Sequence, residues 1–260
     1  MITSTRNAKI ALARKLHTQT KARRAAGAFV IEGVRLAEEA LAAGWPARWV
    51  LYDASLSGRG WEAVSAWERR GVAVEEAADY VLRTASDTQN PQGILALIDV
   101  QEIRLPARLD FVLVLDGVRD PGNLGTILRT AAAAGVGAVF LPPGGADPWS
   151  SKAVRAGMGA HFRLPIYELD WAALESRLAE AGMQVYLAAA GEGQSYADCD
   201  FRAPSALIVG GEATGAGAQA ERLAGTHIHI PMPGGMESLN AAVAAAVLMF
   251  EVVRQRRAVG

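Results

Sequence analysis

The sequence has one cysteine and no long hydrophobic run, and each shortage excludes a class of protein. Cys199 is the only cysteine in 260 residues, so the chain can form no internal disulfide and no thiolate metal site. The longest apolar run lies near residues 241–250 and is about half as long as a membrane span. The first ten residues carry charge with no apolar stretch behind them, so we see no signal peptide. We therefore expect a cytoplasmic globular protein without a metal or a membrane contact.

Basic residues gather at the start of the chain although the net charge is only −1. Among residues 1–35 there are eight Lys and Arg against a single acid, Glu32. Segregation of this kind indicates a local contact with a polyanion. A solvated basic helix would give the same pattern, so charge alone leaves both interpretations open.

Hydrophobic patterns divide the chain into two α/β parts. Residues 1–100 mix short helical and strand patterns and predict a small α/β domain. Residues 101–109 hold charges and a proline with little periodicity, which is typical of a linker. From residue 110, continuous apolar strands such as 111–116 and 206–210 alternate with helical patterns. This alternation predicts a parallel sheet covered by helices on both faces.

The first polar segment, DGVRDPGNLGTILR at 116–129, follows a predicted buried strand. The carboxyl end of a parallel strand is where α/β sheets bind ligands. Asn123 follows an Asp-Pro-Gly turn and is expected to cap the next helix. Arg129 falls beside the apolar positions of that helix and needs a partner there. That partner is either a ligand or a structural ion pair with Asp116 or Asp120.

A glycine-rich segment, LIVGGEATGAG, forms the second candidate site. Gly210 and Gly211 end a predicted strand and allow a ligand to approach closely, with Glu212 beside them. Residues 215–220 also fit a G-x-G-x-x-A dinucleotide pattern. That match is weak, because the pattern starts well after the strand and no suitable acid follows about 20 residues later.

The third candidate is the loop IPMPGGMESLN at 230–240, which runs straight into an apolar helix. Ser238 and Asn240 stand at the start of this helix. The first turn of a helix has free backbone N–H groups and a positive dipole end, so it suits a polar ligand.

Two further sets of residues carry less weight. Lys152 and Arg155 are three apart, hence on one helical face, and are either phosphate contacts or ordinary surface charge. His227 and His229 point the same way along a predicted strand, but no third ligand has suitable spacing, so we expect no metal.

The three segments together resemble the motifs of the SpoU/TrmH family of RNA 2′-O-ribose methyltransferases, which belong to the knotted SPOUT class. The matching residues are Asp120, Pro121, Asn123, Gly125 and Arg129 in the first motif, Gly210, Glu212 and Gly215 in the second, and Ile230, Pro231, Met232, Gly235, Ser238, Leu239 and Asn240 in the third. Three separated motifs in the right order make the match specific, and it covers nearly the whole chain. The first forty residues are similar to the family's N-terminal RNA-binding domain, which resembles small ribosomal proteins.

The resemblance implies the domain organisation and the assembly. Residues 1–100 would be an RNA substrate-binding domain, 101–109 a linker, and 110–260 a SPOUT methyltransferase domain with a deep trefoil knot. It also implies a homodimer with the C-terminal helix in the interface. The apolar character of residues 241–250 agrees with this, although a helix buried within a monomer would look the same.

The resemblance further implies S-adenosylmethionine as cofactor and assigns the site residues. The expected cofactor-binding residues are Ala189, Gly210, Gly211, Ile230, Pro231, Met232, Ser238 and Leu239. The expected catalytic residues are Arg129, Asn123, Glu212, Ser238 and Asn240. Arg129 would act on the ribose 2′-hydroxyl, either as a base or by stabilising the developing alkoxide, and the sequence does not decide between these roles.

The implied substrate is RNA. We expect contacts from Arg6, Lys9, Lys15, Lys21, Arg23, Arg24, Arg35, Lys152 and Arg155. We favour 23S rRNA, because a full N-terminal domain of this type accompanies several rRNA-modifying members of the family. A tRNA ribose methyltransferase and a non-catalytic RNA-binding protein of the same fold are the alternatives, with a nicotinamide-dependent oxidoreductase a distant third.

Overall fold

The computed structural model describes residues 1–191, 193–211 and 215–257, and the chain forms two compact units. The first unit comprises residues 1–101 and 147–162, and the second comprises residues 102–146 and the chain from 163 onward. The segment 147–162 therefore packs with the first unit although it lies inside the second in sequence.

The first unit contains a four-stranded sheet in the order β1-β4-β2-β3. Its strands are β1 (Ala28–Glu32), β4 (Ile94–Asp99), β2 (Ala47–Tyr52) and β3 (Ala73–Glu76). β4 runs antiparallel to both of its neighbours, whereas β2 and β3 are parallel. Every residue of β1 is buried, which is the pattern of a strand covered on both faces.

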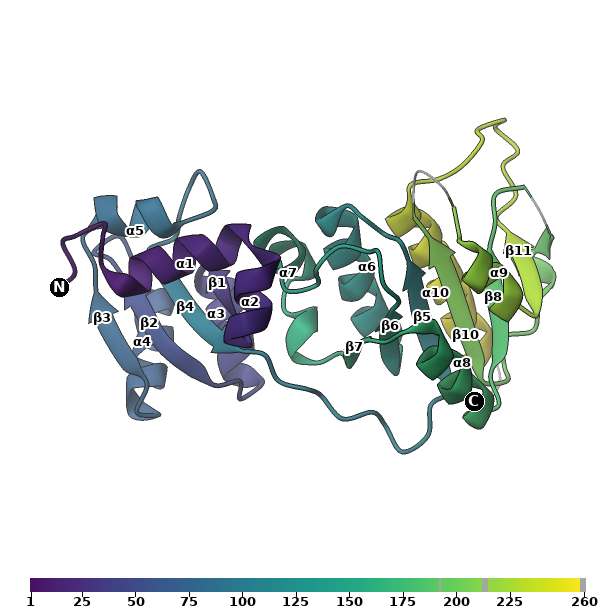
Figure 1. Ribbon diagram of the computed structural model, residues 1–260, viewed down its shortest axis with the longest axis horizontal. Helices are drawn as coiled ribbons and strands as arrows, with labels where there is room; N and C mark the ends of the chain where they lie inside the picture. Colours follow the sequence, from purple (N-terminus) through teal and green to yellow (C-terminus); the bar gives the residue numbers. More distant parts are fainter. Residues whose placement is uncertain (192, 212–214, 258–260) are drawn as a thin grey trace. The chain divides into compact units, whose positions relative to one another are not determined.

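Helices cover both faces of this sheet (Figure 1). They are α1 (Ala8–Thr18), α2 (Thr20–Ala26), α3 (Val34–Ala42), α4 (Gly58–Arg69), α5 (Asp79–Ala85), α7 (Ser151–Gly157) and the 3-10 turn η1 (Ala160–Phe162). Ile10 of α1 and Val81 of α5 share one core cluster with Val30 of β1. The preceding residue, Phe29, faces the opposite side, as strand geometry requires. Its ring centroid lies 4.9 Å from that of Trp149, so the segment 147–162 completes this part of the core.

The second unit is built on a seven-stranded sheet in the order β7-β6-β5-β10-β8-β11-β9. Its strands are β5 (Phe111–Asp116), β6 (Ala138–Leu141), β7 (Ile166–Glu168), β8 (Gln184–Ala188), β9 (Gln194–Ser195), β10 (Ser205–Gly210) and β11 (Thr226–His229). All the pairs are parallel. The chain moves outward from β5 to β6 and β7, and the later strands lie on the other side of β5. Ligands of open parallel sheets bind at such a reversal of strand order, outside the carboxyl ends of the strands.

Two helix layers enclose this sheet (Figure 1). α6 (Pro121–Ala134) and α10 (Ala241–Arg257) pack against each other on one face. α8 (Trp171–Glu180) and α9 (Ala218–Leu223) cover the other face, where Leu174 and Ala220 join a cluster with Val112 of β5. α6 buries Leu124, Ile127 and Leu128, which the 3.6-residue period places on one side of the helix.

The expected architecture is confirmed: a small mixed α/β unit and a parallel-sheet α/β unit. The trefoil knot stays a prediction. Among the α-helices and strands, the sequence patterns missed α2, α5, α9, β3, β7 and β9, each seven residues or shorter. Such short elements show too few turns or alternations for periodicity to reveal them. Among the described residues, no helix is long and apolar enough to cross a bilayer.

Candidate cofactor and active site

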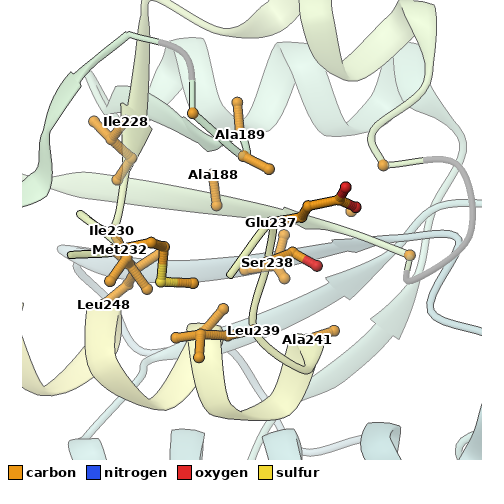
Figure 2. Close-up of a pocket in the computed structure, with 17 residues that line it drawn as sticks. Ala188, Ala189, Ile228, Ile230, Met232, Glu237, Ser238, Leu239, Ala241 and Leu248 are labelled. Carbon is orange, nitrogen blue, oxygen red and sulfur yellow. The ribbon is translucent and has the colours of Figure 1, made fainter. Parts of the chain in front are cut away.

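A cavity of about 250 Å³ opens at the carboxyl ends of β8, β10 and β11. The segments after these strands form its walls, together with the first turns of α10. Alanine, glycine and aliphatic residues make up most of the lining, including Ala188, Ile228 and Leu248 (Figure 2). Small apolar walls with few polar groups are typical of small-molecule sites.

The structure brings most of the expected cofactor-binding residues into this one cavity. Those that line it are Ala189, Gly210, Gly211, Ile230, Met232, Ser238 and Leu239. Pro231, the remaining one, is not part of the lining and is exposed between two residues that are. Residues up to 50 positions apart in the sequence thus meet at one point, because parallel strands end at the same edge of the sheet.

Glu237 lines the cavity as well, and the sequence patterns did not single it out. It is the only charged residue among the described lining residues. Glu237 and Ser238 bring the side-chain oxygen atoms to a mostly apolar pocket (Figure 2). In the sequence, Glu237 stands next to Ser238 in the loop before the apolar helix, and this position could have indicated that Glu237 belongs to the site.

Positions 210 and 211 require glycine because other backbone segments of the protein pass very close to them. A Cβ atom on Gly210 would lie 2.5 Å from the backbone nitrogen of Ala216, and one on Gly211 would lie 2.2 Å from the carbonyl oxygen of Gly117. Asp116 accepts a hydrogen bond of 2.7 Å from the backbone N–H of Gly217 and ties this segment to the end of β5. The two glycines therefore let chain segments pass closely beside the cavity that both of them line, and close approach of a ligand there stays a prediction.

The starts of α6 and α10 are joined by a pair of asparagines. The side-chain nitrogen of Asn240 donates to the side-chain oxygen of Asn123 at 3.2 Å. The side-chain oxygen of Asn240 also accepts from the backbone N–H of Ala242, so Asn240 caps α10. Asn123 is not the cap of α6, contrary to the sequence expectation. That position is Asp120, which accepts from the N–H of Asn123 at 2.8 Å because the helix begins at Pro121.

Arg129 lies on α6, two turns beyond its start, and its side chain is exposed. Within the described parts of the chain we find no hydrogen bond or ion pair to it, including from Asp116 or Asp120, so the structural ion pair considered above is not formed with either. Glu212, the remaining expected catalytic residue, lies outside the described residues.

Comparison with known proteins decides the family. Residues 110–250 match the SpoU rRNA Methylase family model, and residues 7–96 match the MRM3-like substrate binding domain. The chain is 34% identical over 251 residues to the 23S rRNA (guanosine(2553)-2′-O)-methyltransferase RlmP of Bacillus subtilis, covering 96% of this chain and 98% of the relative.

The chain belongs to the SpoU rRNA methylase family. It is an RNA 2′-O-methyltransferase. It is also 33% identical to the 23S rRNA (uridine(2479)-2′-O)-methyltransferase of Streptomyces viridochromogenes, over 97% of this chain and 92% of the relative.

A solved SpoU structure extends the likeness to the fold. The methyltransferase AviRb from Streptomyces viridochromogenes, in complex with AdoMet, superposes with a TM-score of 0.86 at 29% identity, covering 97% of this chain and all of that one. An AdoMet-bound rRNA methyltransferase from Sinorhizobium meliloti gives a TM-score of 0.87 at 33% identity, with 97% of each chain covered.

The first unit of this SpoU protein shows which of the expected RNA contacts face solvent. Arg6, Lys15, Lys21, Arg24, Arg35 and Lys152 are exposed. Lys9 forms an ion pair with Glu75, Arg155 forms one of 2.7 Å with Asp87, and the exposed Arg35 forms one of 3.1 Å with Glu39, so these three are partly neutralised.

Arg23 must be removed from the set of expected RNA contacts. Its guanidinium is buried, and its Nε donates to the Asp147 carboxylate at 2.7 Å. It also donates to the carbonyl oxygen of Leu16 and to the hydroxyl of Thr20. A buried cation whose donors are used within the protein is a structural group. Charge clustering in the sequence gave no sign of this, because Asp147 is far away along the chain.

Proposed function

We propose that this protein transfers a methyl group from S-adenosylmethionine to a ribose 2′-hydroxyl of 23S rRNA. The observation that carries the proposal is the cavity at the carboxyl ends of β8, β10 and β11, where residues of the second and third SpoU motifs meet. The two relatives compared above modify different nucleotides at nearly equal identity, so the proposal names the RNA molecule and not the nucleotide.

The cavity suits the cofactor chemically. S-adenosylmethionine supplies an electrophilic methyl group on a positively charged sulfonium. Ile230, Met232 and Leu239 offer apolar surface for an adenine ring, and the Glu237 carboxylate offers a negative charge to the cationic end. We assign all eight expected residues from Ala189 to Leu239 to cofactor binding, with Pro231 acting by shaping the loop.

The catalytic assignments extend from this cavity along α6. Asn123 and Asn240 hold the starts of α6 and α10 together, and we assign them, with Ser238, to positioning the ribose and the methionine end of the cofactor. Arg129 projects to solvent from α6 with its donors available to a substrate. It would meet the 2′-hydroxyl and either take its proton or stabilise the alkoxide by charge. Glu212 would orient these groups.

We assign substrate binding to the first unit, whose exposed lysines and arginines suit the RNA phosphates. We also place an interface with a second copy on α10 and a trefoil knot around the cofactor loops. We expect the protein to act on RNA in the cytoplasm. The free, buried thiol of Cys199 is compatible with such a reducing compartment.

Replacement of Arg129 tests the catalytic assignment. In the Arg129→Ala variant, we expect methyl transfer to 23S rRNA to fall by at least about 100-fold, the usual effect of removing a charged group that acts in the transition state. Binding of S-adenosylmethionine should stay within about twofold, because Arg129 does not line the cavity. Tritium transfer from labelled cofactor and calorimetry measure the two quantities.

The matched control is Arg222→Ala, which removes an exposed arginine from α9. It should leave both quantities unchanged. Near-normal turnover of the Arg129→Ala variant would contradict the role assigned to Arg129.

A further inference from the structure

The surface loop 86–93, with sequence SDTQNPQG, joins α5 to β4 in the first unit and is held by a buried carboxylate. That carboxylate belongs to Glu32, the last residue of β1, which is only 8% exposed. It accepts a hydrogen bond of 3.0 Å from the backbone N–H of Asp87. It also accepts from the hydroxyls of Ser86 and Thr88. Both oxygens of Glu32 are therefore engaged by three consecutive residues of the loop.

Two further contacts fix the same loop. The side-chain oxygen of Gln92 accepts from the backbone N–H of Val34, the first residue of α3, at 2.9 Å. The Asp87 carboxylate pairs with Arg155 of α7 at 2.7 Å. The loop is thus anchored at three points, to β1, α3 and α7.

A loop that merely connects two elements has no need of this arrangement. Burying a carboxylate costs desolvation free energy, which hydrogen-bond donors must offset. A buried glutamate is therefore an unfavourable way to order a few surface residues if the loop has no further role. Ordered side chains on a fixed loop lose less conformational entropy when they bind a partner. The anchoring therefore indicates a loop prepared for recognition.

The loop presents carboxamide groups to solvent. Gln89 and Asn90 are exposed, and no described residue hydrogen-bonds to either side chain. A carboxamide both donates and accepts, which matches the edges of unpaired nucleobases. The segment 86–93 has no large exposed apolar residue to serve as the anchor of a protein interface. Exposed Lys152 on α7, one of the helices that anchor the loop, adds positive charge that favours an RNA backbone.

We propose that the loop 86–93 reads the bases of the 23S rRNA substrate. Gln89 and Asn90 hydrogen-bond to the edges of unpaired bases of the substrate, and Glu32 is the positioning residue that holds them in place. The exposed lysines of α1 and α2 contact phosphates and carry no sequence preference. This inference rests on the proposed function of the first unit.

Two transcripts test the proposal. One is the 23S rRNA stem-loop that contains the nucleotide methylated by the wild-type protein, and the other has the remaining unpaired bases of that stem-loop replaced. We expect the wild type to bind the native transcript more tightly. The double variant Gln89→Ala/Asn90→Ala should lose about tenfold of that preference, with an unchanged dependence of affinity on salt. Gln101→Ala, an exposed carboxamide in the same unit, is the matched control and should behave as wild type.

Two more variants separate base reading from general affinity. Lys15→Ala/Lys21→Ala should weaken binding of both transcripts equally and lower the salt slope by about one to two. Glu32→Gln keeps the side-chain shape but replaces one acceptor oxygen by a donor group. It should reduce the preference for the native transcript while binding of S-adenosylmethionine, in the other unit, stays unchanged.

Each outcome has a distinct meaning. If Gln89→Ala/Asn90→Ala keeps the full preference for the native transcript, the loop does not read bases and the inference is overturned, while the proposed function stands. If the wild-type protein methylates no site in 23S rRNA, the proposed function fails first and the inference fails with it.

Discussion

At the scale of single residues, a few polar side chains, among them Asn123 and Asn240, define the geometry beside a mostly apolar cavity. Asn240 both caps α10 and donates to Asn123, so one side chain serves helix stability and site geometry together. Asp120, and not Asn123 as expected, caps α6, because the helix already begins at Pro121 and proline fits the first helical position.

Glu237 leads to a prediction about cofactor charge. Replacing it by Gln removes the charge from the described lining of the cavity with little change in size. We expect the affinity for S-adenosylmethionine to fall about fivefold to tenfold, which corresponds to roughly 1 kcal/mol of attraction between a carboxylate and a cation at a solvent-accessible site. The affinity for S-adenosylhomocysteine, which lacks the sulfonium charge, should fall less. Calorimetric titration with both ligands measures the difference.

The control for Glu237→Gln is Glu175→Gln, which removes an exposed carboxylate from α8. It should change the affinity for neither ligand. If Glu237→Gln loses the same affinity for S-adenosylmethionine as for S-adenosylhomocysteine, Glu237 does not act on the sulfonium.

At the scale of elements, α10 has two kinds of surface. It buries Ala245, Leu248 and Val252 against its own unit. Val243 and Phe250, seven residues apart and hence on one face, are each 49% exposed. Large apolar side chains left exposed along a helix indicate a contact with another molecule. This agrees with the proposed dimer.

The prediction for this surface concerns the oligomeric state. Val243→Glu/Phe250→Glu places two like charges on each copy of the interface, so two copies should separate. Sedimentation velocity should show a monomer of 27.4 kDa for the variant and twice that mass for the wild type. Ala172→Glu, on the exposed side of α8, is the control and should stay dimeric. A wild-type protein that sediments as a monomer would contradict the proposed interface.

Long apolar elements were predictable from the sequence, and short or long-range features were not. β5 contains the apolar run FVLVL and β10 the run ALIV, so the burial of these residues follows from composition alone. α2 and α5 are seven residues each and are held by packing against α1 and the sheet. The buried pair of Arg23 and Asp147 joins residues 124 positions apart, and no local pattern contains that information. In the site, motif residues were predictable, whereas Glu237 and the closely passing backbones at Gly210 depend on the folded loops.

At the scale of the whole molecule, stability should depend on the protonation of a buried histidine of the first unit. His161 is fully buried, with Nε2 bonded to the carbonyl oxygen of Pro148 at 2.8 Å and Nδ1 without a partner among the described residues. Burial lowers the pKa of His161 to about 4. Burial also lowers the pKa of His17, against the opposing effect of Asp87 and Glu32.

The sign of the pH effect follows from these directions. The folded-state pKa of His161 lies below the unfolded value near 6.5, so unfolding takes up a proton at acidic pH. Its stabilising contribution is complete above pH 6.5 and is lost as the pH falls toward 4, by about 3 kcal/mol in total. Urea unfolding followed by tryptophan fluorescence, which reports on the packed Trp45 and Trp149, should show this loss.

The His161→Gln variant isolates this effect, because it removes the titrating group and keeps a side chain that can donate to the Pro148 carbonyl. Its free energy of unfolding should be lower than that of the wild type at pH 7 and should change less between pH 6.5 and 4. An equally steep pH dependence in both proteins would rule out His161 as its source.

The central claim is that the protein methylates ribose in 23S rRNA, and the most direct test is to map 2′-O-methylation across total RNA in the source organism. Cells with the gene, cells without it, and cells that carry only Arg129→Ala should be compared. We predict one 23S rRNA site that is methylated in the first and unmethylated in the other two. An unchanged 23S rRNA pattern, or a site lost from tRNA instead, would contradict the account.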